Sequence, residues 1–125
     1  MVFTVEEQEI YDLTVNILKA IRDGDVEKYK QYSSDTLTAI EPESSGLIVD
    51  GLDFHIFFLS HTQPSDYHIE LINPVIRIYH NTAYIAYALI DNTFTDGKFN
   101  LKNVCETRIF EKELGVWRMV HFHRS

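Results

Sequence analysis

The spacing of hydrophobic positions changes about half way along the chain. The first part is helical: apolar residues recur every three or four positions between Thr4 and Gly24. Thr4 and Glu7 have the spacing of a capping box, and Gly24 can adopt the left-handed conformation that ends a helix. Asp25 can cap a second, shorter helix that runs to Tyr32. The sequence therefore predicts two consecutive helices at the start of the chain.

The middle of the chain has weaker signals. Residues 37–40 predict a short strand, and residues 46–51 predict a turn. The apolar segment LDFHIFFL, residues 52–59, has a length that fits a buried strand as well as a short helix. Asp50 is a potential N-cap for this segment, which favours a helix, and Pro64 is expected to close it.

After residue 68 the pattern becomes that of long strands. Four are predicted, with turn residues between the second and third and between the third and fourth, and with a bulge or sheet-edge position near Pro74 in the first. Their ranges are 69–79, 82–95, 99–112 and 116–124. Helices followed by a meander of strands predict one α+β domain over residues 1–125, with a mostly antiparallel sheet.

The strand at 82–95 is apolar on both faces. A sheet with one solvated face alternates apolar and polar residues, and this strand does not. The few short helices can cover one face, so the other needs a different cover, and a second copy of the chain is the simplest. An enclosed central strand of a monomer is the alternative. The residues expected at an interface between copies are Tyr84, Ile85, Ala86, Tyr87, Ala88 and Leu89.

Composition excludes several classes of function. Eleven basic residues against nineteen acidic ones give a formal charge of -8, which argues against a nucleic-acid partner. The single cysteine, Cys105, excludes an intramolecular disulfide and fits a reducing, cytoplasmic compartment. The first ten residues lack the features of a secretory signal, and no apolar run has the length of a membrane span.

Histidine and arginine residues on the last two strands are the main chemical features. His121 and His123 point to one face, but no spacing identifies a third metal ligand, so we expect packing roles and no metal. Arg108 and Arg124 stand among apolar residues, where a cation needs an anionic partner. Glu106 shares strand parity with Arg108 and is the expected partner, within an internal salt bridge or a ligand site.

The sequence shows no catalytic triad, phosphate-binding glycine loop or basic patch, and no catalytic residue or cofactor is expected. An acid/base pair in a cavity, such as Glu41 or Asp91 with a tyrosine, is the feature that would make the chain a small enzyme. The first interpretation is nevertheless self-association, with such an enzyme, of the isomerase or hydrolase type, as the alternative. A monomeric or dimeric binding module is the third possibility.

Several segments resemble the association (hub) domain of calcium/calmodulin-dependent protein kinase II. They are EPESSGLIVDGLDFH, INPVIRIY, TAYIAYALI, ETRIFEK and VWRMVHFHRS, and the resemblance covers nearly the whole chain. It implies the nuclear-transport-factor-2-like fold, in which a curved, mostly antiparallel sheet wraps over the N-terminal helices. It also implies stacked rings of about a dozen or more subunits that hold kinase subunits together. Calmodulin binding belongs to the full-length family. The chain carries no kinase segment, so we expect either a fragment or a free-standing hub-like protein.

The resemblance also implies a pocket lined by arginines. Two family arginines correspond to Arg108 and Arg124, and His55 is a further pocket residue by resemblance. Leu89 occupies the position of a third arginine, which is expected to weaken binding. Ile56 replaces another family arginine next to His55. The expected ligands are a small carboxylate or an acidic peptide, bound without turnover.

Overall fold

The computed structural model describes residues 2–63 and 65–125, so the predicted break at Pro64 lies outside the described residues. Within these ranges the helices come first and the long strands last, which confirms the predicted α+β class. The elements are α1 (Val5–Asp23), α2 (Val26–Tyr32), β1 (Ser33–Ile40), the 3-10 turn η1 (Pro42–Ser44), β2 (Ile48–Asp50), α3 (Asp53–Ser60), β3 (Asp66–Tyr79), β4 (Thr82–Thr95), β5 (Lys98–Glu113) and β6 (Val116–Arg124).

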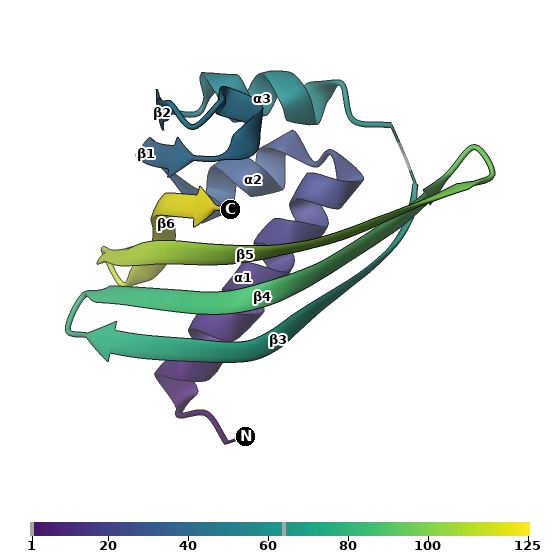
Figure 1. Cartoon of the computed structure of the whole chain (residues 1–125). Helices are drawn as coiled ribbons and strands as arrows, with labels where there is room; N and C mark the ends of the chain where they lie inside the picture. Colours follow the sequence, from purple (N-terminus) through teal and green to yellow (C-terminus); the bar gives the residue numbers. More distant parts are fainter. Residues whose placement is uncertain (1, 64) are drawn as a thin grey trace.

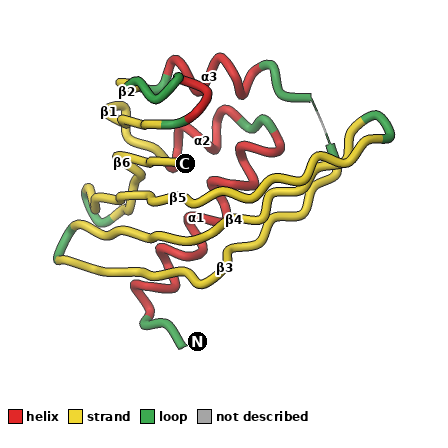
Figure 2. Tube along the Cα trace, viewed as in Figure 1, coloured by secondary structure: helices red, strands yellow, loops and turns green. Residues whose placement is uncertain are grey.

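The described strands form one curved sheet in the order β2-β1-β6-β5-β4-β3. Neighbouring strands run antiparallel except β1 and β6, which are parallel. Helix α1 packs against β3 and β4, and α2 packs against β1 and β6 (Figure 1). The long strands β3, β4 and β5 continue together past the helices toward the β4–β5 hairpin (Figure 2).

Local signals set the first two helices as predicted. The Thr4 hydroxyl accepts from the amide of Glu7 and the Glu7 carboxylate accepts from the amide of Thr4, so the capping box is present. Gly24 ends α1 with φ 65°, and the Asp25 side chain caps α2 by accepting from the amide of Lys28. The buried residues of α1, which include Ile10 and Ile17, face the sheet.

The middle of the chain differs from expectation in three places. Residues 52–59 are helical as predicted, but Asp50 is not the cap: it lies in β2, and Leu52 holds the N-cap position without a side-chain hydrogen bond. The predicted turn at 46–51 contains β2, a short strand that pairs with β1. The predicted strand at 37–40 begins earlier, at Ser33, because pairing with β6 and burial compensate for the low strand propensity of its serines.

The four long strands agree with the prediction. The register of β3 and β4 shifts between Ile72 and Val75, which is the bulge expected near Pro74, and β3 is an edge strand. The β4–β5 and β5–β6 turns have positive φ at both central residues, as two-residue hairpin turns of type I′ require. In β4 the buried side chains alternate with partly exposed ones, so one face of the strand belongs to the core.

Candidate functional site

A buried charged cluster lies between β4, β5 and β6, at the inner end of a pocket. Arg108 is completely buried. Its guanidinium donates to the Tyr87 hydroxyl at 3.0 Å, to the Met119 sulfur at 3.1 Å and to the Glu106 carboxylate at 3.2 Å. The Tyr87 hydroxyl donates to the same carboxylate at 2.5 Å, and the Phe122 ring lies 4.7 Å below the guanidinium carbon. Arg108 is therefore a fixed buried cation that the core already compensates.

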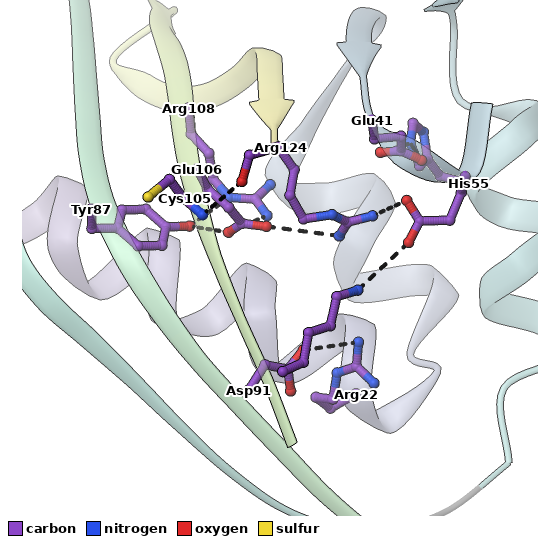
Figure 3. A network of polar contacts seen from close by, with 12 residues as sticks. Arg22, Glu41, His55, Tyr87, Asp91, Cys105, Glu106, Arg108 and Arg124 are labelled. Atoms are coloured by element: carbon purple, nitrogen blue, oxygen red, sulfur yellow. Dashed lines mark hydrogen bonds and ion pairs between the residues drawn. The ribbon is translucent and has the colours of Figure 1, made fainter. Parts of the chain in front are cut away.

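A second layer of charges lies nearer to solvent. Arg124 pairs with Glu106 across the β5–β6 register and holds the Glu43 carboxylate through Nη2, while its Nη1 is 3.8 Å from Glu106 (Figure 3). Lys102 also reaches Glu43, with Nζ 3.7 Å from the carboxylate. Glu43 comes from η1, so an acidic side chain of the β1–β2 connection lies against the arginine of the last strand.

An ion pair and a histidine–carboxylate hydrogen bond complete the surroundings of the pocket. Arg22, at the end of α1, lies 3.2 Å from Asp91 of β4 (Figure 3). His55 of α3 lies 3.2 Å from both oxygens of Glu41. Each of these two buried acidic side chains thus faces an arginine or a histidine.

The pocket is small, about 180 Å³, which is below the range of drug-sized sites and fits a small ligand. Helix α1, α3, the β1–β2 connection and the last two strands contribute its walls. The lining residues are Ile21, Arg22, Tyr29, Glu41, Glu43, His55, Phe58, Leu59, Thr62, Arg108, Phe122 and Arg124.

Burial and neighbouring charges set the protonation of the pocket. Burial raises the pKa of Tyr29 and of Tyr87, so both phenols keep their protons at neutral pH. Burial disfavours the charge on Arg108, but Tyr87 and the Glu106 carboxylate outweigh it and raise the pKa of Arg108. Burial also opposes the charge on Glu43, but its backbone hydrogen bond and Arg124 lower the pKa of Glu43 overall.

Two buried nitrogen atoms in the pocket have no hydrogen-bond partner within the described residues: Nδ1 of His55 and Nε of Arg124. Buried polar groups are normally hydrogen-bonded, so unpartnered ones in a cavity are available to a ligand or to water. Nε of Arg124 always carries a proton and can donate to an anion, whereas Nε2 of His55 donates to Glu41, so Nδ1 of a neutral His55 is an acceptor.

The sequence-predicted pocket residues come together in space. Arg108, Arg124 and His55 line the pocket, and Glu106 pairs with both arginines. Leu89, which stands at the position of a family arginine, is buried in the core. The proposed acid/base residues Glu41 and Asp91 are each held by a basic side chain.

The proposed interface residues divide by strand parity. Ile85, Tyr87 and Leu89 lie in the core, whereas Tyr84, Ala86 and Ala88 are on the opposite face and are partly or fully exposed. The three core residues are therefore not available for a contact between copies, and Tyr84, Ala86 and Ala88 are the candidates that remain. Of the histidine pair, His121 lies 2.7 Å from the Thr38 hydroxyl. No cluster of three metal-ligating side chains occurs among the described residues.

Sequence reasoning missed Arg22, Glu43 and Lys102. Arg22 looked like an ordinary basic residue in the last turn of a helix, and Glu43 like a solvated residue of a loop. Both acquire a partner only when distant segments meet, so periodicity could not have found them. No helix of the described residues is long and apolar enough to cross a membrane.

Comparison with known proteins identifies close relatives. Residues 6–125 match the family described as the calcium/calmodulin dependent protein kinase II association domain. The type II kinase subunit delta of Oryctolagus cuniculus is 35% identical over 125 residues, which cover 95% of this chain and 23% of that protein. The chain thus spans less than a quarter of the length of this relative.

Solved structures give the same result. The association domain of the Caenorhabditis elegans kinase superposes with a TM-score of 0.89 at 30% identity, covering 96% of this chain and 95% of that one. The hub homology domain of Chlamydomonas reinhardtii has a TM-score of 0.86 at 29% identity, with 98% of both chains covered. An NTF2-like protein of Cytophaga hutchinsonii, 20% identical with a TM-score of 0.80 and 98% of both chains covered, shows the fold alone.

Proposed function

The chain belongs to the calcium/calmodulin-dependent protein kinase II association-domain family, and from that premise we propose that it is a self-association scaffold. The family match over residues 6–125 is the observation that carries this proposal, and the close superposition on hub structures supports it. Copies of the chain close into a ring, because a head-to-tail interface that closes leaves no open edge. The resemblance to hub domains implies stacked rings of about a dozen or more subunits. The ring would act in the cytoplasm, and it would gather kinase domains wherever they are joined to the chain.

The outer face of the long strands is the proposed contact between copies. Tyr84, Ala86 and Ala88 of β4 lie on this face, away from the core. On neighbouring β3, Val75 is 42% exposed and Tyr79 is 59% exposed, and the Tyr79 ring stacks on Tyr84 at 6.4 Å between centroids. An exposed apolar and aromatic surface of this kind, over β4 and the edge strand β3, is typical of a protein interface.

The pocket is proposed to bind a small carboxylate or the acidic side chains of a peptide. Arg124 provides a buried Nε–H that has no partner within the described residues, His55 lines the pocket beside it, and Arg108 and Glu106 fix the inner end of the pocket. Arginine is well suited to this role because its planar guanidinium binds carboxylates through paired hydrogen bonds.

Turnover is not part of the proposal, since the association domain is the non-catalytic part of the kinase family. A protein of Parabacteroides distasonis named as a ketosteroid isomerase shares the fold, at 19% identity, a TM-score of 0.72, and 95% of this chain and 86% of that one covered. A pocket isomerase needs a carboxylate free to exchange protons with its substrate. Here Glu41, Asp91 and Glu106 are each bound to a basic side chain.

Native mass spectrometry tests the assembly. Wild type is expected to give one large closed oligomer at micromolar concentration, with a mass unchanged by chelator or reductant. Ala86→Glu places a carboxylate on the outer face and is expected to reduce the assembly to monomers or dimers, because an unpaired charge at an interface costs several kcal/mol. Gln31→Glu adds the same charge on exposed α2 and should assemble normally. A monomeric or dimeric wild type would refute the proposed function.

A further inference from the structure

We infer that Glu43 is a resident carboxylate that occupies the ligand position of the pocket, at Arg124 and Lys102, and that an external carboxylate binds by replacing it. This inference deepens the pocket part of the proposed function and rests on it. It assigns the binding position to the outer layer of charges, where Glu43 lies, and leaves the buried Arg108 in a structural role.

The inner layer is already complete without a ligand. Arg108 donates hydrogen bonds to Tyr87, Met119 and Glu106, and its side chain is only 1% exposed to solvent. An external carboxylate that reached Arg108 would have to displace Glu106, which the Tyr87 hydroxyl also holds at 2.5 Å. Displacing a buried carboxylate would leave it uncompensated in the core. A ligand therefore stops at the outer layer.

The outer layer is held by a side chain that can leave. The side chain of Glu43 is 37% exposed, so it would be solvated after release. It comes from η1, whose hydrogen bonds are local: the Ser44 hydroxyl donates to the carbonyls of Glu41 and Leu47, and the amide of Ser45 donates to Pro42. Releasing Glu43 thus breaks ion pairs but no sheet hydrogen bond.

The vacated position suits a carboxylate. Arg124 and Lys102 both point at this position. Burial alone would raise the pKa of Glu43, but attraction by these two cations helps to lower it below its ordinary value. Nε of Arg124, which has no partner within the described residues, offers a further hydrogen bond that Glu43 itself does not make. A ligand in the outer layer that also accepts from this atom gains a charge-assisted hydrogen bond, so exchange has a physical driving force.

The resident carboxylate reduces the apparent affinity of the wild type. When only a fraction of the molecules is in the binding-competent state, the apparent affinity is the intrinsic affinity multiplied by that fraction. If the pocket is open about a tenth of the time, removal of the resident charge tightens binding about tenfold. Glu43→Gln keeps the shape of the side chain and removes the charge that competes.

The experiment measures binding of two probes. Trifluorobutyrate is titrated by fluorine NMR, and an acetylated tetraglutamate peptide is titrated by calorimetry. Glu43→Gln is compared with wild type, with Glu9→Gln, which removes one exposed charge from the first turns of α1, and with a Glu43→Gln/Arg124→Gln double variant. We expect binding about tenfold tighter in Glu43→Gln, unchanged in Glu9→Gln, and lost in the double variant. The probe whose affinity increases more in Glu43→Gln than in wild type identifies the source of the carboxylate, a free acid or a peptide.

Other results would overturn the inference in distinguishable ways. Equal binding of wild type and Glu43→Gln that still depends on Arg124 would show that the pocket binds carboxylates but that Glu43 does not compete. Absence of binding in both would overturn the inference and the pocket proposal together. The mass of each variant, measured in parallel, reports on self-association independently of either result.

Discussion

Replacing Glu106 by glutamine tests whether the buried cluster stabilises the fold through compensation of charge. Glu106 is 3% exposed and Arg108 is fully buried, and the carboxylate accepts hydrogen bonds from Arg108 and from Tyr87. The substitution preserves shape, and the amide oxygen of the new side chain can still accept from Tyr87. What disappears is the only negative charge in direct contact with Arg108 within the described chain.

The expected loss follows from the burial of the cation that remains. Removing one partner of a buried ion pair typically costs about 3–5 kcal/mol, because the other charge stays in a poorly polarisable environment. Hydrogen bonds to charged groups account for roughly 1.5–3 kcal/mol each, and one such bond to Arg108 is weakened here. We therefore expect Glu106→Gln to lower the free energy of unfolding by about 3–5 kcal/mol.

Urea unfolding followed by tryptophan fluorescence measures this change, with every variant at one protomer concentration because assembly contributes to apparent stability. A Tyr87→Phe/Glu106→Leu/Arg108→Met triple variant is the control, since it removes the whole network and leaves no unpaired charge. It is expected to be more stable than the single variant. A loss below about 1 kcal/mol in Glu106→Gln would refute the view that Arg108 depends on this carboxylate.

Two further predictions concern local features. Gly24→Ala should destabilise the fold by about 1–3 kcal/mol, because φ is 65° and the new Cβ would lie 3.1 Å from the carbonyl oxygen of Leu59. Gly97→Ala, with φ 76° and open space around it, should cost less in thermal unfolding, and equal losses would contradict the steric part of the reasoning. Burial and the neighbouring His123 lower the pKa of His121, so the unfolded chain binds this proton more readily and stability is lost as pH falls through 6.5, the ordinary value. His121→Gln should therefore show a smaller drop in melting temperature between about pH 7.5 and about pH 5.5 than wild type, and an equal drop would contradict the assignment.

The elements that local chemistry specifies were predictable from the sequence. Thr4 and Glu7 cap α1 through side chains three residues apart, and Gly24 ends it through its own backbone freedom. The bulge near Pro74 has the same origin, since proline cannot donate to a ladder. In each case the signal and its structural consequence lie within a few residues of each other.

The elements that depend on distant pairing were not predictable in this way. The first residues of β1 are serines with low strand propensity, and they are strand because β6 runs beside them. The pairing of Arg22 with Asp91 joins the end of α1 to the middle of β4. Glu106 and Arg108 were accessible to sequence reasoning because both lie on one strand with the same parity, two residues apart.

Strand parity also separates the pocket from the proposed assembly surface. On β4 and β5 the inward side chains of Tyr87, Glu106 and Arg108 build the buried cluster, while Ala86 and Thr107, which pair across the same two strands, point outward. Because the side-chain period of a strand is two, a slip of one residue would exchange the two faces and place Arg108 outside. The buried cluster opposes such a slip, since it is satisfied only in the observed register. A charge cluster in the core thus helps to specify which apolar residues remain on the outer face, where copies of the chain are proposed to meet.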